Sequence, residues 1–421
     1  QKPTLTRASD GPVGEAMDHD LADVPTVAIL PLTTVTTGGE EAFFVSGLVA
    51  EMVSELSRYQ DIIALPCQEV VSPGVGGGTL LREVSREIGA RFLVGGTVRR
   101  DASRMKVTVQ LNDAITDRQI WGDSYSIDLE ATDLIDTQEE IACGVMAAIA
   151  GEYGIIARRL SGESRKKRPA DLTTYEALLH YHHYMLVMTP EAGEAAFEAL
   201  QQATEREPEY APAWAGLAHL HTHVVVLDRP GIEEPLETAR AYARRAAALD
   251  PYSQLARTIL AYVYLLRGEM APFWSEVETA LALNPNSPNY SGSVGFLLAS
   301  AGDFERGRQL LQRAIALNPC HPKWFHHALF LVHFSRGDYE EAYRAALQIG
   351  FTVGFWDPTL RAAALGKLGR EDEARAAARD LLQLKPDFET RVRELLSYTT
   401  KPADVVEDIL DGLRLAGLQI D

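Results

Sequence analysis

Hydrophobic and polar positions give the first half of the chain the pattern of an α/β domain. Residues 27–32 and 62–65 are short apolar runs of the kind found in buried strands. Between residues 105 and 111, apolar and polar side chains alternate as in a strand with one buried face. The other predicted elements are helices at 41–58, 79–89 and 133–160 and strands at 91–98 and 119–126. The order β-α-β-α-β-β-β-α indicates an α/β domain with a mixed sheet over residues 25–160.

The second half of the chain carries a repeated pattern. The tripeptides Leu-Asp-Pro or Leu-Asn-Pro end at residues 251, 285 and 319, and so recur every 34 residues. Proline lacks a backbone N–H and disfavours helix in the residue before it, so each proline is predicted to follow the end of a helix. This period is that of the tetratricopeptide repeat, a helix-turn-helix unit. We therefore predict an all-α solenoid of about five or six such repeats over residues 172–400.

The segments outside these two units are predicted to connect or cap them. Residues 1–24 are polar, contain glycine and proline and show no periodicity, which indicates a flexible linker. Residues 161–171 belong to a stretch rich in basic residues, glycine and proline and are predicted to form a second linker. A basic patch for nucleic acid or lipid is the less favoured interpretation in so acidic a chain. Residues 401–421 are predicted to form the capping helix that an open solenoid needs.

Composition narrows the class of partner. Of the 421 residues, 59 are acidic and 40 are basic, so the formal net charge is -19. Phosphate affinity depends on clustered lysine and arginine, so we expect no direct binding to nucleic acid. No apolar run approaches the length of a membrane-spanning helix, so no membrane insertion is expected. The chain begins at Gln1 without a signal-like stretch, which suggests a processed protein or a piece of a longer one.

Two stretches of the first half resemble the TolB amino-terminal-like domain. They read VAILPLTTVTTGGEEAFFVSGLVAEMVSELSRYQDIIAL and EIGARFLVGGTVRRDASRMKVTVQLNDAITDRQIWGDSYSIDL. In bacteria, a domain of this family often precedes tetratricopeptide repeats, behind the winged-helix domains of transcriptional regulators or behind adenylate cyclase domains. Together with the repeats, the resemblance covers residues 26–417 and implies the sensory or interaction part of a regulator. The family has no agreed catalytic motif, so the resemblance implies no catalytic residue.

Histidines and glycines offer only weak candidates for chemistry. The pairs His180/His183 and His219/His223 each share a helix face, a geometry that metal ligands use. No cysteine or carboxylate accompanies them by motif, so packing roles are favoured and no metal is predicted. The loop Gly74–Thr79 could hold a phosphate on backbone amides, but it lacks the Lys-Ser/Thr ending of a P-loop. Since a GxSxG motif is also absent, we predict no catalytic residue and no cofactor.

Aromatic side chains are predicted to line the groove of the repeats. In tetratricopeptide repeats, the ninth position of the first helix faces the concave side, and counting back from each proline places aromatic rings or a histidine there. The predicted groove residues are His219, Tyr262, Asn289, Phe296, Lys323, His326, Phe330 and His333. Exposed aromatic patches usually mark contact sites. The alternative is that the chain covers this surface itself, with the insertion at 228–235 or with the N-terminal domain.

These features favour the non-catalytic sensor and protein-interaction region of a bacterial regulatory protein, of the transcriptional or cyclase-type signalling kind. The expected partner is a protein or peptide, or a small ligand, in the repeat groove, and association into a homo-oligomer is left open. A standalone scaffold for an envelope or secretion complex is the alternative, and a nucleotide-binding enzyme is a weaker one. The expected compartment is the cytoplasm, or the periplasm if an upstream signal or membrane segment was removed.

Overall fold

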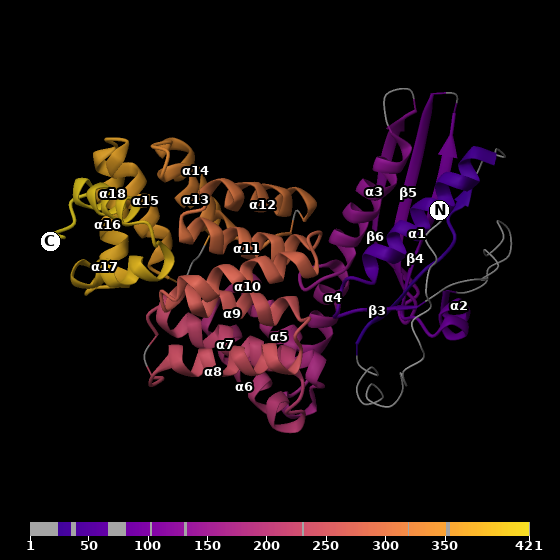
Figure 1. The fold of residues 1–421 in the computed structure, drawn as a ribbon, viewed down its shortest axis with the longest axis horizontal. Helices are drawn as coiled ribbons and strands as arrows, with labels where there is room; N and C mark the ends of the chain where they lie inside the picture. The colour runs from indigo at the N-terminus through magenta and orange to yellow at the C-terminus, as the bar shows by residue number, and fades with distance from the viewer. Residues whose placement is uncertain are drawn as a thin grey trace, which may run out of the picture.

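A small mixed sheet with its own helices precedes a long array of helices in the computed structural model (Figure 1). The structure describes residues 24–34, 39–65, 81–101, 103–129, 133–229, 231–318, 320–350 and 354–420. The glycine loop Gly74–Thr79 lies outside the described residues, and so do residues 1–23 of the first predicted linker. The predicted combination of a small mixed sheet with a mostly helical remainder is confirmed.

The sheet has the strand order β3-β1-β4-β5-β6. Its strands are β1 (Thr26–Ile29), β3 (Ile63–Leu65), β4 (Phe92–Arg100), β5 (Arg104–Asp113) and β6 (Arg118–Asp128), and the two-residue β2 (Thr33–Thr34) pairs with β4. Strand β1 runs parallel to β3 and β4, whereas β4, β5 and β6 form an antiparallel meander. The short strand β2 has no counterpart in the predicted order.

Helices cover the two faces of the sheet unequally. They are α1 (Gly39–Leu56), α2 (Leu81–Ile88) and α3 (Leu134–Ile149). Leu48 of α1 and Val145 of α3 share a core cluster with Val94 of β4. The next residue back, Leu93, belongs to a smaller cluster with Val84 of α2. Successive side chains of a strand point to opposite faces, so the apolar run in β4 supplies both clusters.

The helix predicted at 133–160 is two helices with a turn between them. Helix α3 ends at Ile149, and α4 (Ile155–Ser164) begins after a short turn. Gly151 in the turn has φ = 77°, a conformation that favours glycine. At Gly154, a Cβ atom would lie 2.3 Å from the carbonyl oxygen of Ala150. These glycines break the helix, and the turn directs Glu152 and Tyr153 towards the repeats.

The start of the second predicted linker is helical, because α4 continues to Ser164 and is bound to the sheet domain. The buried carboxylate of Asp113, at the end of β5, pairs with Arg91 at 3.3 Å and with Arg159 of α4 at 3.4 Å. Arg91 also pairs with Glu163 of α4 at 2.9 Å. A buried carboxylate requires such partners, so the charges of this stretch fix the helix instead of leaving it solvated.

The remaining helices pack in consecutive antiparallel pairs, as tetratricopeptide repeats do, except the last two, of which the second packs mainly on an earlier helix (Figure 1). They are α5 (Thr174–Val187), α6 (Pro190–Arg206), α7 (Ala211–Val226), α8 (Pro235–Leu249), α9 (Gln254–Leu266), α10 (Met270–Leu283), α11 (Pro288–Ala301), α12 (Phe304–Leu317), α13 (Phe325–Phe334), α14 (Tyr339–Ile349), α15 (Trp356–Lys367), α16 (Glu371–Leu384), α17 (Phe388–Thr399) and α18 (Ala403–Leu415). This part of the chain has the helix-pair architecture of tetratricopeptide repeats.

Local backbone geometry explains the repeat. Asp250, Asn284 and Asn318, which precede the repeated prolines, leave the helix with φ of -132°, -150° and -128°. Proline disfavours helix in the residue before it, so the second helix of each pair ends there. Gly268 and Gly302 turn the chain between the two helices of a pair with φ of 73° and 101°.

The last helix, α18, lies in the segment 401–421, for which a capping helix is predicted. It packs against α15 at very short range, since a Cβ atom on Gly366 would lie 2.0 Å from the carbonyl oxygen of Gly412. Glycine at both positions therefore allows the two backbones to touch. Among the residues that the structure describes, no helix is long and apolar enough to cross a membrane.

Candidate functional site

The first helices of successive repeats surround a cavity on the concave side of the array. Helices α5, α7, α9, α11 and α13 form its wall, and α15, α17 and the turn between α3 and α4 contribute to its ends. The volume that the centre of a water molecule can reach in it is ≈ 90 Å³. That is room for several waters or a small organic molecule.

Aromatic and imidazole rings follow one another along this cavity. His219 meets Tyr262 with ring centroids 5.6 Å apart, and Tyr262 meets Phe296 at 6.3 Å. Phe296 meets His327 at 5.9 Å, and His327 meets Trp356 at 5.3 Å. Most of these pairs are edge-on, the arrangement that aromatic rings prefer. One wall of rings thus runs from α7 to α15.

Four of the eight predicted groove residues line the cavity. His219, Tyr262, Asn289 and Phe296 all contribute to its wall. They are brought together because each lies on the first helix of its repeat, one repeat after the other. Tyr262 is only 7% exposed, and Phe296 is half-buried, so the predicted ladder is a largely buried surface.

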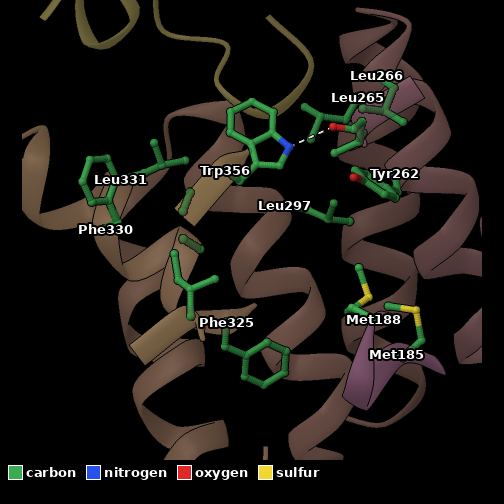
Figure 2. Packing of buried hydrophobic residues seen from close by; sticks show 14 of the residues in the cluster. Met185, Met188, Tyr262, Leu265, Leu266, Leu297, Phe325, Phe330, Leu331 and Trp356 are labelled. Carbon is green, nitrogen blue, oxygen red and sulfur yellow. Dashed lines mark hydrogen bonds between the residues drawn. The ribbon is translucent and has the colours of Figure 1, made fainter. Parts of the chain in front are cut away.

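The other four predicted groove residues lie elsewhere. Phe330 is completely buried in the core, where it stacks on Phe334 at 5.0 Å, and it points away from Tyr262 (Figure 2). Lys323 is exposed, and Nε2 of His326 lies 3.1 Å from Nε2 of His321, outside the cavity. His333 is half-buried near the end of α13 and does not line the cavity either.

Counting back from the proline gives the wrong groove residue in α13, because this helix begins later after its proline than the first helices of the preceding repeats do. Residues 321–324 form a turn, and α13 begins only at Phe325. As a result, His327 occupies the place beside Phe296 that the sequence count assigns to Phe330. Trp324, in the turn itself, also reaches Phe296, with centroids 5.4 Å apart.

The sheet domain meets one end of the ring ladder, as the alternative considered from the sequence has it for the N-terminal domain, and α15 meets the other end. At one end, Glu152 and Tyr153 reach in from the sheet domain. At the other, Trp356 of α15 donates its indole N–H to the carbonyl oxygen of Val226 at 2.8 Å (Figure 2). This bond joins the last repeats to the second one. Asp228, within the insertion, adds ion pairs to Lys385 and Arg391 near α17.

The paired histidines do not form a metal site in the described part of the chain. His219 and His223 are neighbours, with ring centroids 4.6 Å apart. Nδ1 of His219 is hydrogen-bonded to the hydroxyl of Tyr181 at 2.6 Å, and Nδ1 of His223 is hydrogen-bonded to the hydroxyl of Tyr184 at 2.9 Å. No cluster of three or more histidine, cysteine or acidic side chains suited to a metal occurs among the described residues.

The other pair lies on a different side of α5. His183 has its Nε2 atom 2.7 Å from the guanidinium of Arg165, after the end of α4. His180 is half-buried beside the same end of α4 and does not line the cavity. The residue between them, His182, faces the cavity instead. Adjacent helical residues project in different directions, so the i,i+3 pair and His182 cannot serve one site.

Glu152 is the most unusual side chain at the cavity, and the sequence analysis did not single it out. Its carboxylate is 5% exposed, and its Oε2 accepts a hydrogen bond of 2.7 Å from Nδ2 of Asn289. Burial, and then the negative charge of Asp61, raises the pKa of Glu152 to about 7. No lysine or arginine is among the described residues that line the cavity. The only signal in the sequence is the pair of glycines that flank this position.

A wide cleft between the sheet domain and the repeats adjoins the cavity. It has a volume of ≈ 990 Å³ by the same measure and shares Glu152, His182, Leu255 and Tyr290 with the cavity. Direct contacts between the sheet domain and the repeats border the cleft. Gln60 donates to the carbonyl oxygen of Tyr252 at 2.9 Å, for example. A molecule in the cleft therefore lies next to the shared residues.

Comparison with known proteins finds relatives for parts of the chain. No protein-family model matches it. "Putative adenylate cyclase 3" of Rhizobium meliloti (strain 1021) is 28% identical over 200 residues, which cover 46% of this chain and 32% of that protein. The chain thus spans about a third of the length of this curated relative.

Solved structures resemble the chain weakly. TolB from Acinetobacter baumannii has 14% identity and a TM-score of 0.23, covering 31% of this chain and 30% of its own. PilF of Pseudomonas aeruginosa has 16% identity and a TM-score of 0.33, covering 52% and 99%. A thermophilic TPR protein of Thermus thermophilus has 23% identity and a TM-score of 0.33, covering 44% and 98%. Structural similarity at these TM-scores carries no information about function.

Proposed function

We propose that this chain is the non-catalytic sensor region of a bacterial regulatory protein and that it binds a small ligand inside the repeat array. The supporting observation is the cavity, whose wall includes residues of the sheet domain as well as of the repeats. A ligand there touches both parts of the chain, so its binding energy depends on how they are arranged. A site of that kind couples occupancy to conformation.

Cyclase-type signalling is the kind of regulation that we favour over transcriptional regulation. The supporting observation is the curated relative, whose name is that of an adenylate cyclase. The chain matches only part of that protein, so the role assigned to this region is to sense and not to catalyse. A protein or peptide partner would bind outside the cavity, because most of the ring ladder is buried.

A substitution that fills the cavity tests this function in the natural gene. Ser293 of α11 lines the cavity, and Ser293→Leu adds apolar volume to it. We expect cells that carry this change, and cells with the gene deleted, to lose the regulated part of their cyclic AMP response. The control is Ser275→Leu on the exposed face of α10, which should leave cyclic AMP at the wild-type level.

The result also separates the two kinds of regulator. If deletion leaves cyclic AMP unchanged but alters transcript levels, the protein is a transcriptional regulator and the cyclase-type assignment is wrong. If neither quantity responds to deletion, the regulatory proposal as a whole is wrong. Circular dichroism of the purified variant confirms that Ser293→Leu has left the helices folded.

A further inference from the structure

Several buried polar atoms at the cavity have no hydrogen-bond partner within the described structure. Both ring nitrogens of His182 are in this state, and so are Oδ1 of Asn289 and Nε2 of His327. The three side chains are between 3% and 8% exposed. Buried polar groups in native proteins nearly always have a partner. Orphaned atoms gathered around one cavity therefore indicate an occupant with hydrogen-bonding groups.

Glu152 already accepts hydrogen bonds from Asn289 and from the hydroxyl of Tyr290, and acceptor atoms without a partner lie beside it. Asn289 uses its amide nitrogen to donate to Glu152, so its free atom is the oxygen. Burial lowers the pKa of His182 to about 3, so its ring is neutral and keeps one acceptor nitrogen. The site thus offers a carboxylate, an amide oxygen and an imidazole nitrogen. The three donors of an ammonium group match these three acceptors, whereas the N–H of His182 and the unpartnered indole N–H of Trp324 need an acceptor other than the ammonium group.

The rest of the cavity favours a cation with an apolar body. Its wall consists largely of aromatic rings together with Met185, Leu255, Ile259 and Leu297. Aromatic faces attract a cation, and they attract it most when water is excluded. No described lysine or arginine lines the wall and competes for Glu152. An anionic ligand would meet a buried carboxylate without any positive charge to offset it.

The cleft that adjoins the cavity is acidic. The carboxylates along it are Asp61, Glu152, Glu207, Glu209 and Asp250, whereas Arg58 is the one basic side chain among its described lining residues. Arg58 is itself paired with Glu55, at 3.4 Å. A cleft lined by one sign of charge concentrates ions of the opposite sign. The approach to the shared residues at Glu152 and His182 is therefore selective for cations.

We propose that the cavity is a binding site for a small amine with an apolar body, whose ammonium group is held by Glu152, Asn289 and His182. The apolar body lies along the ring ladder, towards Tyr262 and Phe296. The amine enters through the acidic cleft between the sheet domain and the repeats. This proposal rests on the sensor function proposed above and specifies its ligand class.

Three probes of the same shape and different charge test the ligand class. They are 2-phenylethylamine, the neutral 2-phenylethanol and the anionic phenylacetate, each titrated into the full chain by calorimetry at pH 8. We expect the amine to bind with a dissociation constant of about 1 mM or lower. The alcohol should bind at least about tenfold more weakly, because it lacks the charge-assisted hydrogen bonds. Phenylacetate should not bind.

Two variants test the site. Glu152→Gln should weaken amine binding at least about tenfold and leave alcohol binding nearly unchanged, because only the charge is removed. Asn289→Ala should weaken amine binding as well, through loss of the amide oxygen, and it tests the site independently if Glu152→Gln misfolds. The control is Glu205→Gln, which removes one exposed carboxylate of α6 outside the cleft and should change nothing.

Each other outcome overturns the proposal. If the alcohol or phenylacetate binds as tightly as the amine, the site does not select cations. If no probe binds at about 10 mM, well above the expected constant, the cavity holds only water. If Glu152→Gln binds the amine normally, the ammonium lies elsewhere. Such an outcome does not contradict the sensor function if Ser293→Leu still abolishes the cyclic AMP response. The two proposals can therefore be rejected independently.

Discussion

At the scale of single residues, Glu152 combines burial, an amide partner and a second acidic residue nearby. The charge of Asp61 and the lack of solvent both disfavour its ionised form. The other titratable groups that interact with it are the phenols of Tyr59, Tyr153, Tyr175, Tyr181 and Tyr290, all of which keep their protons because their own pKa values are raised. His182, in the same wall, is neutral. A cation bound beside Glu152 would add to the hydrogen bonds from Asn289 and Tyr290 in stabilising the ionised carboxylate.

The free energy of unfolding should depend on pH because of the ionisation of Glu152. Its pKa rises from 4.5 to about 7 on folding, so the folded chain holds the proton more tightly than the unfolded chain. The contribution to stability is then greatest below pH 4.5 and is lost as the pH rises to about 7. Glu152→Gln cannot ionise, so it should be more stable than wild type at pH 8, by on the order of 2 kcal/mol.

Urea unfolding of both proteins between pH 5 and 8 measures this difference. Asp61, whose pKa burial raises to about 6, interacts with Glu152, so the difference between the two curves reports the ionisation of this carboxyl pair and not of Glu152 alone. A difference that stays constant with pH would show that Glu152 is ionised throughout the range. Amine binding should respond in the opposite direction and strengthen as the pH rises, because the ammonium needs the ionised carboxylate.

At the scale of elements, the turn between α3 and α4 is what brings Glu152 to the repeats. Gly151 has φ = 77°, and a Cβ atom there would lie 3.2 Å from the ring of Tyr59. Gly151→Ala should therefore destabilise the chain by about 1–2 kcal/mol and weaken amine binding by displacing Glu152. Calorimetric melting and titration with 2-phenylethylamine measure the two effects.

A second glycine serves as the matched control for this substitution. Gly162 lies inside α4, and nothing lies within 4 Å of the position where its Cβ atom would be. Gly162→Ala should stabilise the chain by about 0.5–1 kcal/mol, since alanine favours helix over glycine. If Gly151→Ala behaves like Gly162→Ala, the left-handed turn is not what positions Glu152.

The elements that follow from local chemistry are the ones that sequence analysis predicts well. Asn284 before Pro285 ends α10, and Gly302 ends α11. The helix ends that define the repeat are thus determined by residues adjacent in the sequence. The break at Gly151 is also local, but helical spacing continues across it and suggests one helix from 133 to 160. The prediction that Phe330 lines the groove is wrong for a different reason. The turn at 321–324 changes which face of α13 meets the cavity.

The candidate site depends on contacts that no local pattern contains. Glu152 meets Asn289 across 137 positions of sequence, and Trp356 meets Val226 across 130. Sequence analysis places His219, Tyr262, Asn289 and Phe296 on the concave side because the period aligns the repeats. It cannot show that distant segments close over them, since closure depends on how much the whole array curves.

At the scale of the whole molecule, the repeats curve until their ends meet around the cavity. The C-terminal end of α7 contacts α15 and α17 through Val226 and Asp228. On the other side, the sheet domain contacts α9–α11 through loops that follow α1 and α3. The cavity thus keeps all of its walls only while both sets of contacts hold, so an occupant that adds to either set stabilises the closed array.

The ion pairs of Asp228 should control this closure. Its carboxylate lies 2.5 Å from Nζ of Lys385 and 2.6 Å from a guanidinium nitrogen of Arg391. Asp228→Asn removes the charge but keeps a residue that tolerates its positive φ of 49°. We expect a loss of about 1 kcal/mol and faster amide hydrogen exchange in both α17 and the end of α7.

Hydrogen exchange followed by mass spectrometry distinguishes opening of the array from general loosening. The control is Glu407→Gln, which removes an ion pair between Glu407 and Arg393, on neighbouring helices α18 and α17. That pair does not reach α7, so exchange in α7 should stay at the wild-type rate in the control. Equal rates in α7 for wild type and Asp228→Asn would mean that Trp356 and its bond to Val226 hold the array closed without the ion pairs.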